Sequence, residues 1–175
     1  MDDAPVTSSR SFIVLFVCTG NQCRSPMAQA LFENLIKHPG DGGIHADSAG
    51  TSVYNTYTPI EEAVVIAQEH GLNITGIRSK PCTAEQINEA DLILTMGKMH
   101  QAFIVNSVPS AKDKTFLLTS FGRSTEDPKY DTEIEDPIGG EPEDYRLCFE
   151  TLDREVRRVY PLIRRGVRTE PSDAT

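Results

Sequence analysis

The feature that most constrains the fold is an uninterrupted apolar run near the start of the chain, residues 12–17, with the sequence FIVLFV. Both alternating faces of this run are apolar, so a strand formed by it is buried on both sides. Strands of this kind are typical of parallel sheets that helices cover on both faces. The run therefore predicts an α/β fold with this strand in its core.

The rest of the chain alternates between strand-like and helix-like patterns. Helical periodicity or helix-ending signals are found at residues 26–38, 60–70, 83–90, 97–107 and 142–165. Further strands are expected at residues 44–49, 91–95 and 114–118, and residues 120–140 have no periodicity and are expected to form a loop. This alternation predicts a three-layer sandwich, in which a four-stranded parallel sheet carries helices on both faces and the crossovers are right-handed.

Two of the helices carry capping signals at their starts. Ser25 is expected to cap the helix at 26–38, with Pro26 at its first position. Thr83 is expected to cap the helix at 83–90, with Gln86 completing a capping box.

The length of 175 residues and a hydrophobic fraction of 38% predict one compact domain that needs no disulfides to hold its core. We expect a single domain over residues 1–175, with its core at 12–165 and loose tails at 1–11 and 168–175.

Composition argues against several classes of protein. The net charge of −9 disfavours a nucleic-acid binder, which usually carries a basic patch. The longest apolar run is far shorter than the ~20 residues that span a bilayer, and the acidic start of the chain does not resemble a signal peptide. The four cysteines are too scattered for a disulfide scaffold, and no histidine stands at zinc-ligand spacing from them. We therefore expect no metal, no membrane contact and a cytoplasmic location with free thiols.

The segment after the first strand is where an open α/β sheet places its site, because ligands bind outside the carboxyl ends of the strands. Residues 18–26 read CTGNQCRSP, a cysteine followed after five residues by arginine and serine. Gly20 and Asn21 tolerate positive φ, so the loop can curl and aim its N–H groups inward. Such a nest at a helix N-terminus binds a phosphate-like anion.

The side chains of this loop fit nucleophilic attack on phosphorus. Arg24 offers a planar fork of donors for two phosphate oxygens. The positive surroundings favour the thiolate of Cys18, and Ser25 is placed to hydrogen-bond its sulfur. The competing interpretation is a buried free cysteine beside a capped helix, which does not explain why glycine, asparagine and arginine stand where an anion loop needs them.

A thiolate that attacks phosphorus also needs a proton donor for the leaving group. Two Asp-Pro pairs offer one, at Asp127 and at Asp136. Asp136 is favoured, because it stands at the end of the loop that leads into the last helix, whereas Asp127 lies in the middle of that loop and is expected to be a solvated turn residue.

These residues resemble a known family, the low-molecular-weight protein-tyrosine phosphatases. The resemblance rests on residues 17–28 (VCTGNQCRSPMA), 48–51 (SAGT), 90–96 (ADLILTM) and 136–137 (DP), and covers about residues 12–165. It implies hydrolysis of phosphotyrosine in proteins through a cysteinyl-phosphate intermediate, without metal or cofactor. Phosphate or sulfate is the anion expected in the loop.

The resemblance also implies a role for each matching residue. Cys18 corresponds to the nucleophile, Arg24 to the phosphate clamp, and Asp136 to the acid that later activates water. The residues expected to shape the loop or bind the phosphate are Thr19, Gly20, Asn21, Gln22, Cys23, Ser25 and Ser48. A reversible Cys18–Cys23 disulfide is a further property that the resemblance implies.

Two departures from the family pattern leave the leaving group open. Tyrosine-specific members often carry aromatic residues after Asp-Pro, where this chain has Ile138 and two glycines, and an aliphatic residue where it has Gln22. Protein-arginine phosphatases of the same fold, which carry a small polar residue and an aromatic-Gly-Gly at these places, are the first alternative. Tyr54 and Tyr57 are candidates for an aromatic wall beside a phenyl ring, or are surface tyrosines.

Two further alternatives have a different chemistry. A thioredoxin-coupled arsenate reductase shares the loop, but it needs two more cysteines as a relay, and this chain has Met96 where one is expected. Cys82 and Cys148 are predicted to have no near partner. A non-catalytic phosphoprotein-binding module is the second alternative, and the presence of both the cysteine and the arginine argues against it.

The remaining charged residues are expected to have simple roles. The four histidines are scattered and none is predicted to act as a base, and the arginines of the last helix are predicted to be solvated. Residues 126–144 hold nine acidic residues and one lysine, a net charge of −8. The acidity of the chain therefore gathers on the loop of Asp136, which suggests a preference for phosphorylated sites with basic flanks.

Overall fold

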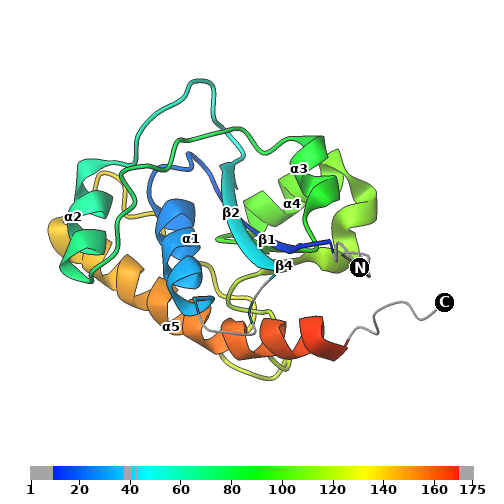
Figure 1. Cartoon of the computed structure of the whole chain (residues 1–175). Coiled ribbons are helices and arrows are strands. Elements are labelled where there is room, and N and C mark those ends of the chain that lie inside the picture. The colour runs from blue at the N-terminus through cyan, green and yellow to red at the C-terminus, as the bar shows by residue number, and fades with distance from the viewer. Residues whose placement is uncertain (1–9, 38–40, 42, 170–175) are drawn as a thin grey trace, which may run out of the picture.

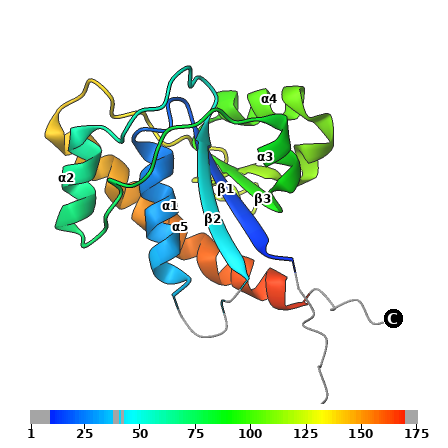
Figure 2. The same cartoon turned by 45° about the horizontal axis from the view of Figure 1, so that its top comes forward.

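The protein, described by a computed structural model over residues 10–37, 41 and 43–169, is built on one parallel sheet. Its strands are β1 (Phe12–Cys18), β2 (Ile44–Gly50), β3 (Leu92–Thr95) and β4 (Thr115–Leu117), in the spatial order β2-β1-β3-β4. All three pairings are parallel, and Figures 1 and 2 show the strands between two groups of helices. The predicted fold class, a four-stranded parallel sheet in an α/β sandwich, is confirmed.

The run 12–17 forms a central strand, β1, with neighbours on both sides. Its side chains divide between two core clusters: Val14 and Phe16 face one, and Leu15 and Val17 face the other. At its end Cys18 pairs with Gly50 of β2, one residue after Val17 pairs with Thr95 of β3. The carboxyl ends of three strands therefore meet at one edge of the sheet.

Helices cover both faces of this sheet. The helical elements are α1 (Arg24–Leu35), α2 (Glu61–Glu69), α3 (Ala84–Glu89), α4 (Lys98–Ser107), a 3-10 helix η1 (Pro109–Lys114) and α5 (Pro142–Thr169). The first core cluster takes residues from α1, α2 and α5, and the second from α3 and α4. Within the described ranges no helix is long and apolar enough to cross a membrane.

The helix boundaries differ from the sequence prediction at the start of α1 and at the end of α5. Helix α1 begins at Arg24, and its N-cap Cys23 makes no side-chain cap, so Ser25 lies inside the helix and does not cap it. The capping box of Thr83 and Gln86 is confirmed. Helix α5 continues past its predicted end to Thr169, so the start of the predicted C-terminal tail is helical. The rest of that tail and residues 1–9 lie outside the described residues.

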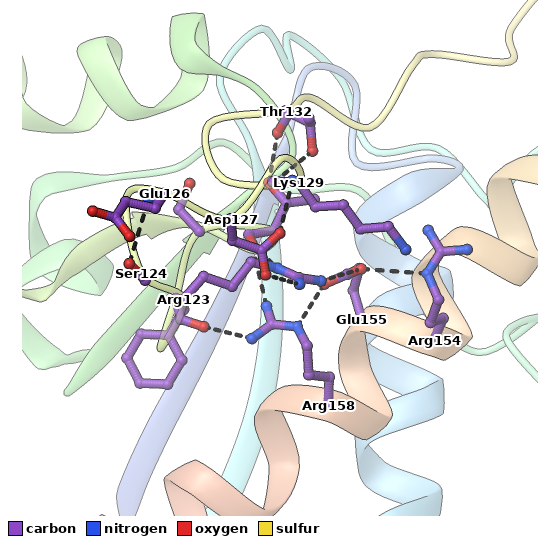
Figure 3. A network of polar contacts seen from close by, with 12 residues as sticks. Arg123, Ser124, Glu126, Asp127, Lys129, Thr132, Arg154, Glu155 and Arg158 are labelled. Atoms are coloured by element: carbon purple, nitrogen blue, oxygen red, sulfur yellow. Dashed lines mark hydrogen bonds and ion pairs between the residues drawn. The ribbon is translucent and has the colours of Figure 1, made fainter.

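A buried carboxylate fastens the segment after β4 to the last helix (Figure 3). Glu155 of α5 is 1% exposed and accepts hydrogen bonds of 2.9 Å from Arg123 and 2.8 Å from Arg158. Arg158 also donates to the carbonyl groups of Leu118 and Phe121. The prediction that the arginines of α5 are solvated is therefore wrong for Arg158, because backbone carbonyls of a distant loop need its donors.

The charge of Glu155 depends on these partners. Burial alone raises the pKa of its carboxyl group, but the hydrogen bonds and positive charges of Arg158 and Arg123 outweigh burial and hold the pKa below its usual value. The carboxylate is therefore ionised in the folded protein and ties residues 118–123 to α5.

We expect Glu155→Ala to lower the free energy of unfolding by about 3 kcal/mol, because it leaves two guanidinium groups without their buried partner. Urea denaturation followed by circular dichroism measures this loss. Asp153→Ala is the matched control, since Asp153 forms a more exposed ion pair with Arg157 on the same helix, and its removal is expected to cost less than ~1 kcal/mol. Equal losses in the two variants would contradict the buried anchor.

Candidate active site

The sulfur of Cys18 lies at the carboxyl end of β1, against the first turn of α1. Its Sγ atom is 3.0 Å from Oγ of Ser25, and both residues are buried. Because Ser25 lies within the helix, its hydroxyl group is free to turn back toward the sulfur instead of capping the N-terminus. This hydroxyl can donate to a thiolate, and the helix N-terminus adds positive potential at the same point.

The amide of Asn21 holds the loop in its curled shape. Its Nδ2 donates to Oγ of Ser25 at 2.8 Å and to Oγ of Ser48 on β2 at 3.0 Å, while its Oδ1 accepts from the backbone N–H of Lys80 at 3.0 Å. The side chain is fully buried, and all of these groups are satisfied within the fold. The structure thus brings together Asn21, Ser25 and Ser48, the three residues expected to shape the loop.

One residue of the loop, Asn21, has the backbone conformation of a tight turn. Asn21 has φ = 52°, in the left-handed region, whereas Gly20 does not lie there. The glycine that close packing requires is Gly50, at the end of β2. A methyl group on Gly50 would lie 2.6 Å from the carbonyl oxygen of Thr19 and 3.0 Å from the backbone nitrogen of Asn21. Sequence reasoning missed this role, although Gly50 lies in the SAGT motif.

Arg24 and Asp136 face one another across the mouth of the loop. Nη2 of Arg24 is 2.8 Å from Oδ2 of Asp136, and Nη1 donates to the carbonyl group of Ile134 at 2.9 Å. Ile134 is itself held by the carbonyl group of Met96 at the end of β3. The guanidinium group is buried, while the Asp136 side chain remains 39% exposed. The carboxyl group therefore stands between the phosphate clamp and solvent, where a leaving group would depart.

Asp127, the other Asp-Pro acid, has a different environment (Figure 3). Its carboxylate pairs with Arg123 at 3.0 Å and accepts the backbone N–H of Lys129 at 2.8 Å. The hydrogen bond from the Lys129 backbone lowers the pKa of Asp127 most, burial opposes it, and the hydrogen bond and charge of Arg123 lower the pKa further. It is an ion-paired residue of the Glu155 anchor and not a free turn residue, and no hydrogen bond among the described residues joins it to the Cys18 loop.

Gln22, Tyr54 and Tyr57, which were expected to contact the substrate, do not all lie against the loop. Gln22 donates to the carbonyl group of Thr58 at 3.3 Å, so its side chain leans toward the segment before α2. Tyr54 is 89% exposed. Tyr57 is half-exposed, and its hydroxyl accepts a hydrogen bond from Asn55. Neither tyrosine is fixed as a wall of the loop, so the aromatic wall stays a prediction.

Three of the four cysteines share one core cluster. Cys18, Cys23 and Cys148 belong to it, whereas Cys82 packs in the other cluster. Burial raises the pKa of Cys23 far above its usual range, with further increases from the charges of Cys148 and Cys18, and burial raises the pKa of Cys148 to about 12. The expectation that Cys148 has no cysteine near it is wrong, because α5 runs beside the loop. All four thiols are free.

His100 is a residue of the site that sequence reasoning missed. It follows β3 on α4, and its Nε2 is 2.8 Å from Oγ1 of Thr19, which also accepts from Arg24 at 3.4 Å. The imidazole is 6% exposed, and its Nδ1 has no hydrogen-bond partner among the described residues. Burial, and then the nearby charge of Arg24, lower the pKa of His100 to about 4. No pattern in the sequence marks it, because the contact depends on β3 lying next to β1.

The described part of the chain holds no group of three or more His, Cys, Asp or Glu side chains placed to bind a metal ion. The site instead offers a buried thiol, a guanidinium clamp, a helix N-terminus and one half-exposed carboxyl group. Together these groups can bind an anion, attack it with sulfur and transfer a proton to the group that leaves.

Comparison with known proteins agrees with this chemistry. A family model described as low molecular weight phosphotyrosine protein phosphatase matches residues 13–169. The chain is 38% identical over 146 residues to a protein-arginine-phosphatase of Geobacillus stearothermophilus (83% of this chain, 92% of the relative). It is 32% identical over 157 residues to the low molecular weight phosphotyrosine protein phosphatase of Sus scrofa (86% and 95%).

Solved structures show the same fold. The YwlE arginine phosphatase from Geobacillus stearothermophilus superposes with a TM-score of 0.80 at 33% identity, covering 93% of this chain and 99% of that one. The tyrosine phosphatase Wzb from Escherichia coli K30, in complex with sulphate, superposes with a TM-score of 0.74 at 28% identity, covering 86% and 97%.

The low pKa of His100 predicts a pH-dependent contribution to stability. The unfolded chain binds a proton at His100 near pH 6.5, and the folded protein does so only near pH 4. Stability is therefore present above pH 6.5 and is lost as the pH falls toward 4. Between pH 7 and pH 4.5, we expect the free energy of unfolding to fall by about 2 kcal/mol more in the wild type than in His100→Gln.

Urea denaturation at the two pH values measures this difference. His45→Gln is the matched control, because His45 is exposed on β2. We expect His45→Gln to lose as much stability on acidification as the wild type. If His100→Gln also lost as much, the fold would not be holding His100 neutral.

Proposed function

The chain belongs to the low molecular weight phosphotyrosine protein phosphatase family, and from this we propose that it hydrolyses phosphotyrosine in proteins through a cysteinyl-phosphate intermediate. The observation that carries the proposal is the contact of Cys18 with Ser25 in the same loop whose Arg24 pairs with Asp136. The substrate is accordingly a phosphorylated protein, and the loop also takes inorganic phosphate or sulfate. The functional unit is a single domain with its core at residues 12–165, and the reduced thiol that the chemistry needs fits a cytoplasmic location.

Substrate binding changes the partner of Arg24. A phosphoryl dianion takes up the planar donors of the guanidinium group, with the N–H groups of residues 19–25 and the α1 N-terminus around its other oxygens. Asp136 then gives up its ion pair with Arg24. Its carboxyl group then turns, as the general acid, to the oxygen that links phosphorus to the leaving group.

The first chemical step transfers the phosphoryl group to the enzyme. The Cys18 thiolate forms a bond to phosphorus while the bond from phosphorus to the phenolic oxygen breaks, and Asp136 gives its proton to that oxygen. Arg24 and the loop N–H groups stabilise the charge on the three phosphoryl oxygens during the transfer. The dephosphorylated tyrosine leaves, and Asp136 is now ionised.

The second step returns the enzyme to its starting state. Asp136 accepts a proton from a water molecule, whose oxygen bonds to phosphorus while the phosphorus–sulfur bond breaks. Ser25 donates a hydrogen bond to the departing Cys18 thiolate. Asn21 donates to the Ser25 oxygen, so the Ser25 hydrogen can point to the sulfur at 3.0 Å or to the more distant carbonyl group of Ala49 at 3.5 Å.

Substitutions of Cys18 and Asp136 test this mechanism. We expect Cys18→Ser to abolish turnover, and Asp136→Asn to lower kcat on a phosphotyrosine peptide by about 10²–10⁴-fold, the range of general acid catalysis. The loss with p-nitrophenyl phosphate is smaller, because its leaving group needs less protonation. The rate of hydrolysis of both substrates is measured by the release of phosphate.

Asp127→Asn is the control, because it changes the other Asp-Pro acid in the same loop. We expect its kcat to stay within about twofold of the wild type, since Asp127 serves an anchor and not the reacting groups. Full turnover by Cys18→Ser would contradict the mechanism. A larger fall in kcat for Asp127→Asn than for Asp136→Asn would reverse the assignment of the acid.

The nature of the phosphorylated residue is tested by direct comparison. Two peptides of one sequence, carrying phosphotyrosine or phosphoarginine, are offered at equal concentration, and kcat/KM is measured by phosphate release. We expect the phosphotyrosine peptide to be hydrolysed faster. A hundredfold preference for phosphoarginine, the substrate class in the names of the Geobacillus relatives, would overturn the assignment of the substrate while leaving the chemistry in place.

A further inference from the structure

A groove leads away from the reacting groups along helix α4. It has a volume of about 580 Å³, and Thr19, Arg24 and Asp136 line its inner end. One wall continues over α4 as far as Phe103 and Asn106. We propose that this groove, which we call the α4 groove, binds the residues that flank the phosphorylated one and selects a basic side chain among them. The inference rests on the proposed function and names the substrate sequence that the site prefers.

Continuity with the phosphate clamp is the first argument. A polypeptide whose phosphoryl group lies against Arg24 must leave the loop along a surface that begins there. The α4 groove contains both Arg24 and Thr19 in its lining. A second groove of about the same volume lies on the other side of residues 133–137, against α5, but neither Arg24 nor Thr19 lines it.

Charge is the second argument. Glu133 and Glu135 line the α4 groove together with Asp136, and both glutamates are exposed. Among the described residues neither glutamate has an ion-pair partner. Lys98, the cation nearest in sequence on α4, is paired with Asp131 at 2.6 Å. Arg24, which also lines the groove, is paired with Asp136. Glu133 accepts the backbone N–H of Lys98 at 2.6 Å, whereas the Glu135 side chain has no hydrogen bond or ion pair among the described residues. The groove therefore presents carboxylates with which a substrate can pair, which favours basic residues and opposes acidic ones.

The apolar wall is the third argument. Met99 is 84% exposed, and it lines the groove beside Ala102 and Phe103. Lysine and arginine have long apolar stems with the charge at the tip, so they cover such a wall while the head reaches carboxylates. An acidic side chain is short and would meet like charge, and a purely apolar side chain would leave Glu133 and Glu135 unused. A basic residue is the occupant that satisfies both walls.

Matched peptides test the proposal. Two phosphotyrosine peptides of equal length carry either arginine and lysine or glutamate and aspartate around the phosphotyrosine, and kcat/KM is measured for each. We expect the basic peptide to be preferred by about tenfold at low salt, as for one or two exposed charge pairs, with a smaller ratio at high salt. Hydrolysis of p-nitrophenyl phosphate, which has no flanking residues, is measured on the same preparations.

Four variants locate the preference. Glu135→Gln and Met99→Ser change the two walls of the α4 groove, and each is expected to lower the basic-to-acidic ratio about threefold. Glu126→Gln is the control for charge, because Glu126 belongs to the same acidic segment but lines neither groove. Leu147→Ser is the control for the groove against α5, which it lines. Both controls are expected to keep the wild-type ratio.

The outcomes separate this inference from the proposed function. Equal rates on the two peptides, or an equal fall of the ratio in Glu126→Gln and Glu135→Gln, would overturn the α4 groove as the selecting surface. A fall in Leu147→Ser without one in Met99→Ser would assign the selection to the groove against α5 instead. No hydrolysis of either p-nitrophenyl phosphate or the peptides by the wild type would instead refute the proposed function itself.

Discussion

The active site depends on one buried amide, the side chain of Asn21. It joins the loop after β1 to Ser48 on β2 and to the backbone of Lys80, so one side chain fixes three separate segments. It also donates to the oxygen of Ser25, so that the hydrogen of this hydroxyl group points away from Asn21 and can reach the Cys18 sulfur. A buried amide with unmet donors would be costly, so the loop holds this shape whether or not an anion is bound.

The acid is positioned by a second, separate set of contacts. Residues 133–137 belong to a long segment without regular structure, and two anchors hold it at different places. Ile134 is tied to Arg24 and to the end of β3, which places Asp136 at the mouth. Glu155 ties the beginning of the segment to α5 through Arg123 and Arg158 (Figure 3). The loop of Cys18 is thus fixed by the sheet, whereas Asp136 is positioned by the Ile134 anchor two residues before it.

The sequence was sufficient for the parts of the fold that apolar periodicity governs. The central strand and the parallel sheet were predicted, because the run at 12–17 and the alternation of elements express burial directly. The loop after β1 was predicted from its motif, Cys18 followed after five residues by Arg24 and Ser25, at the end of that strand. Polar side chains were harder, since periodicity says that a residue is buried or exposed but not which partner it meets. Ser25 suits a cap by its position, yet its hydroxyl turns to a sulfur. Arg158 lies on a helix rich in arginine, yet carbonyl groups about 40 residues away in the sequence bind it. His100 becomes part of the site only once β3 is known to lie beside β1.

The acidity of residues 126–144 shows how the fold divides a charge that composition gives only as a sum. Part of it is compensated: Asp127 by Arg123, Asp131 by Lys98 and Asp136 by Arg24. Beside the mouth, Glu133 and Glu135 have no ion-pair partner among the described residues. An anionic phosphoryl group and an acidic rim are compatible because they act on different parts of the substrate. The buried donors of the loop capture the phosphoryl group at short range, whereas the rim acts on the residues around it and repels sequences of its own sign. The net charge of −9 therefore bears on which phosphorylated sites reach the loop, and not on whether the loop can bind phosphate.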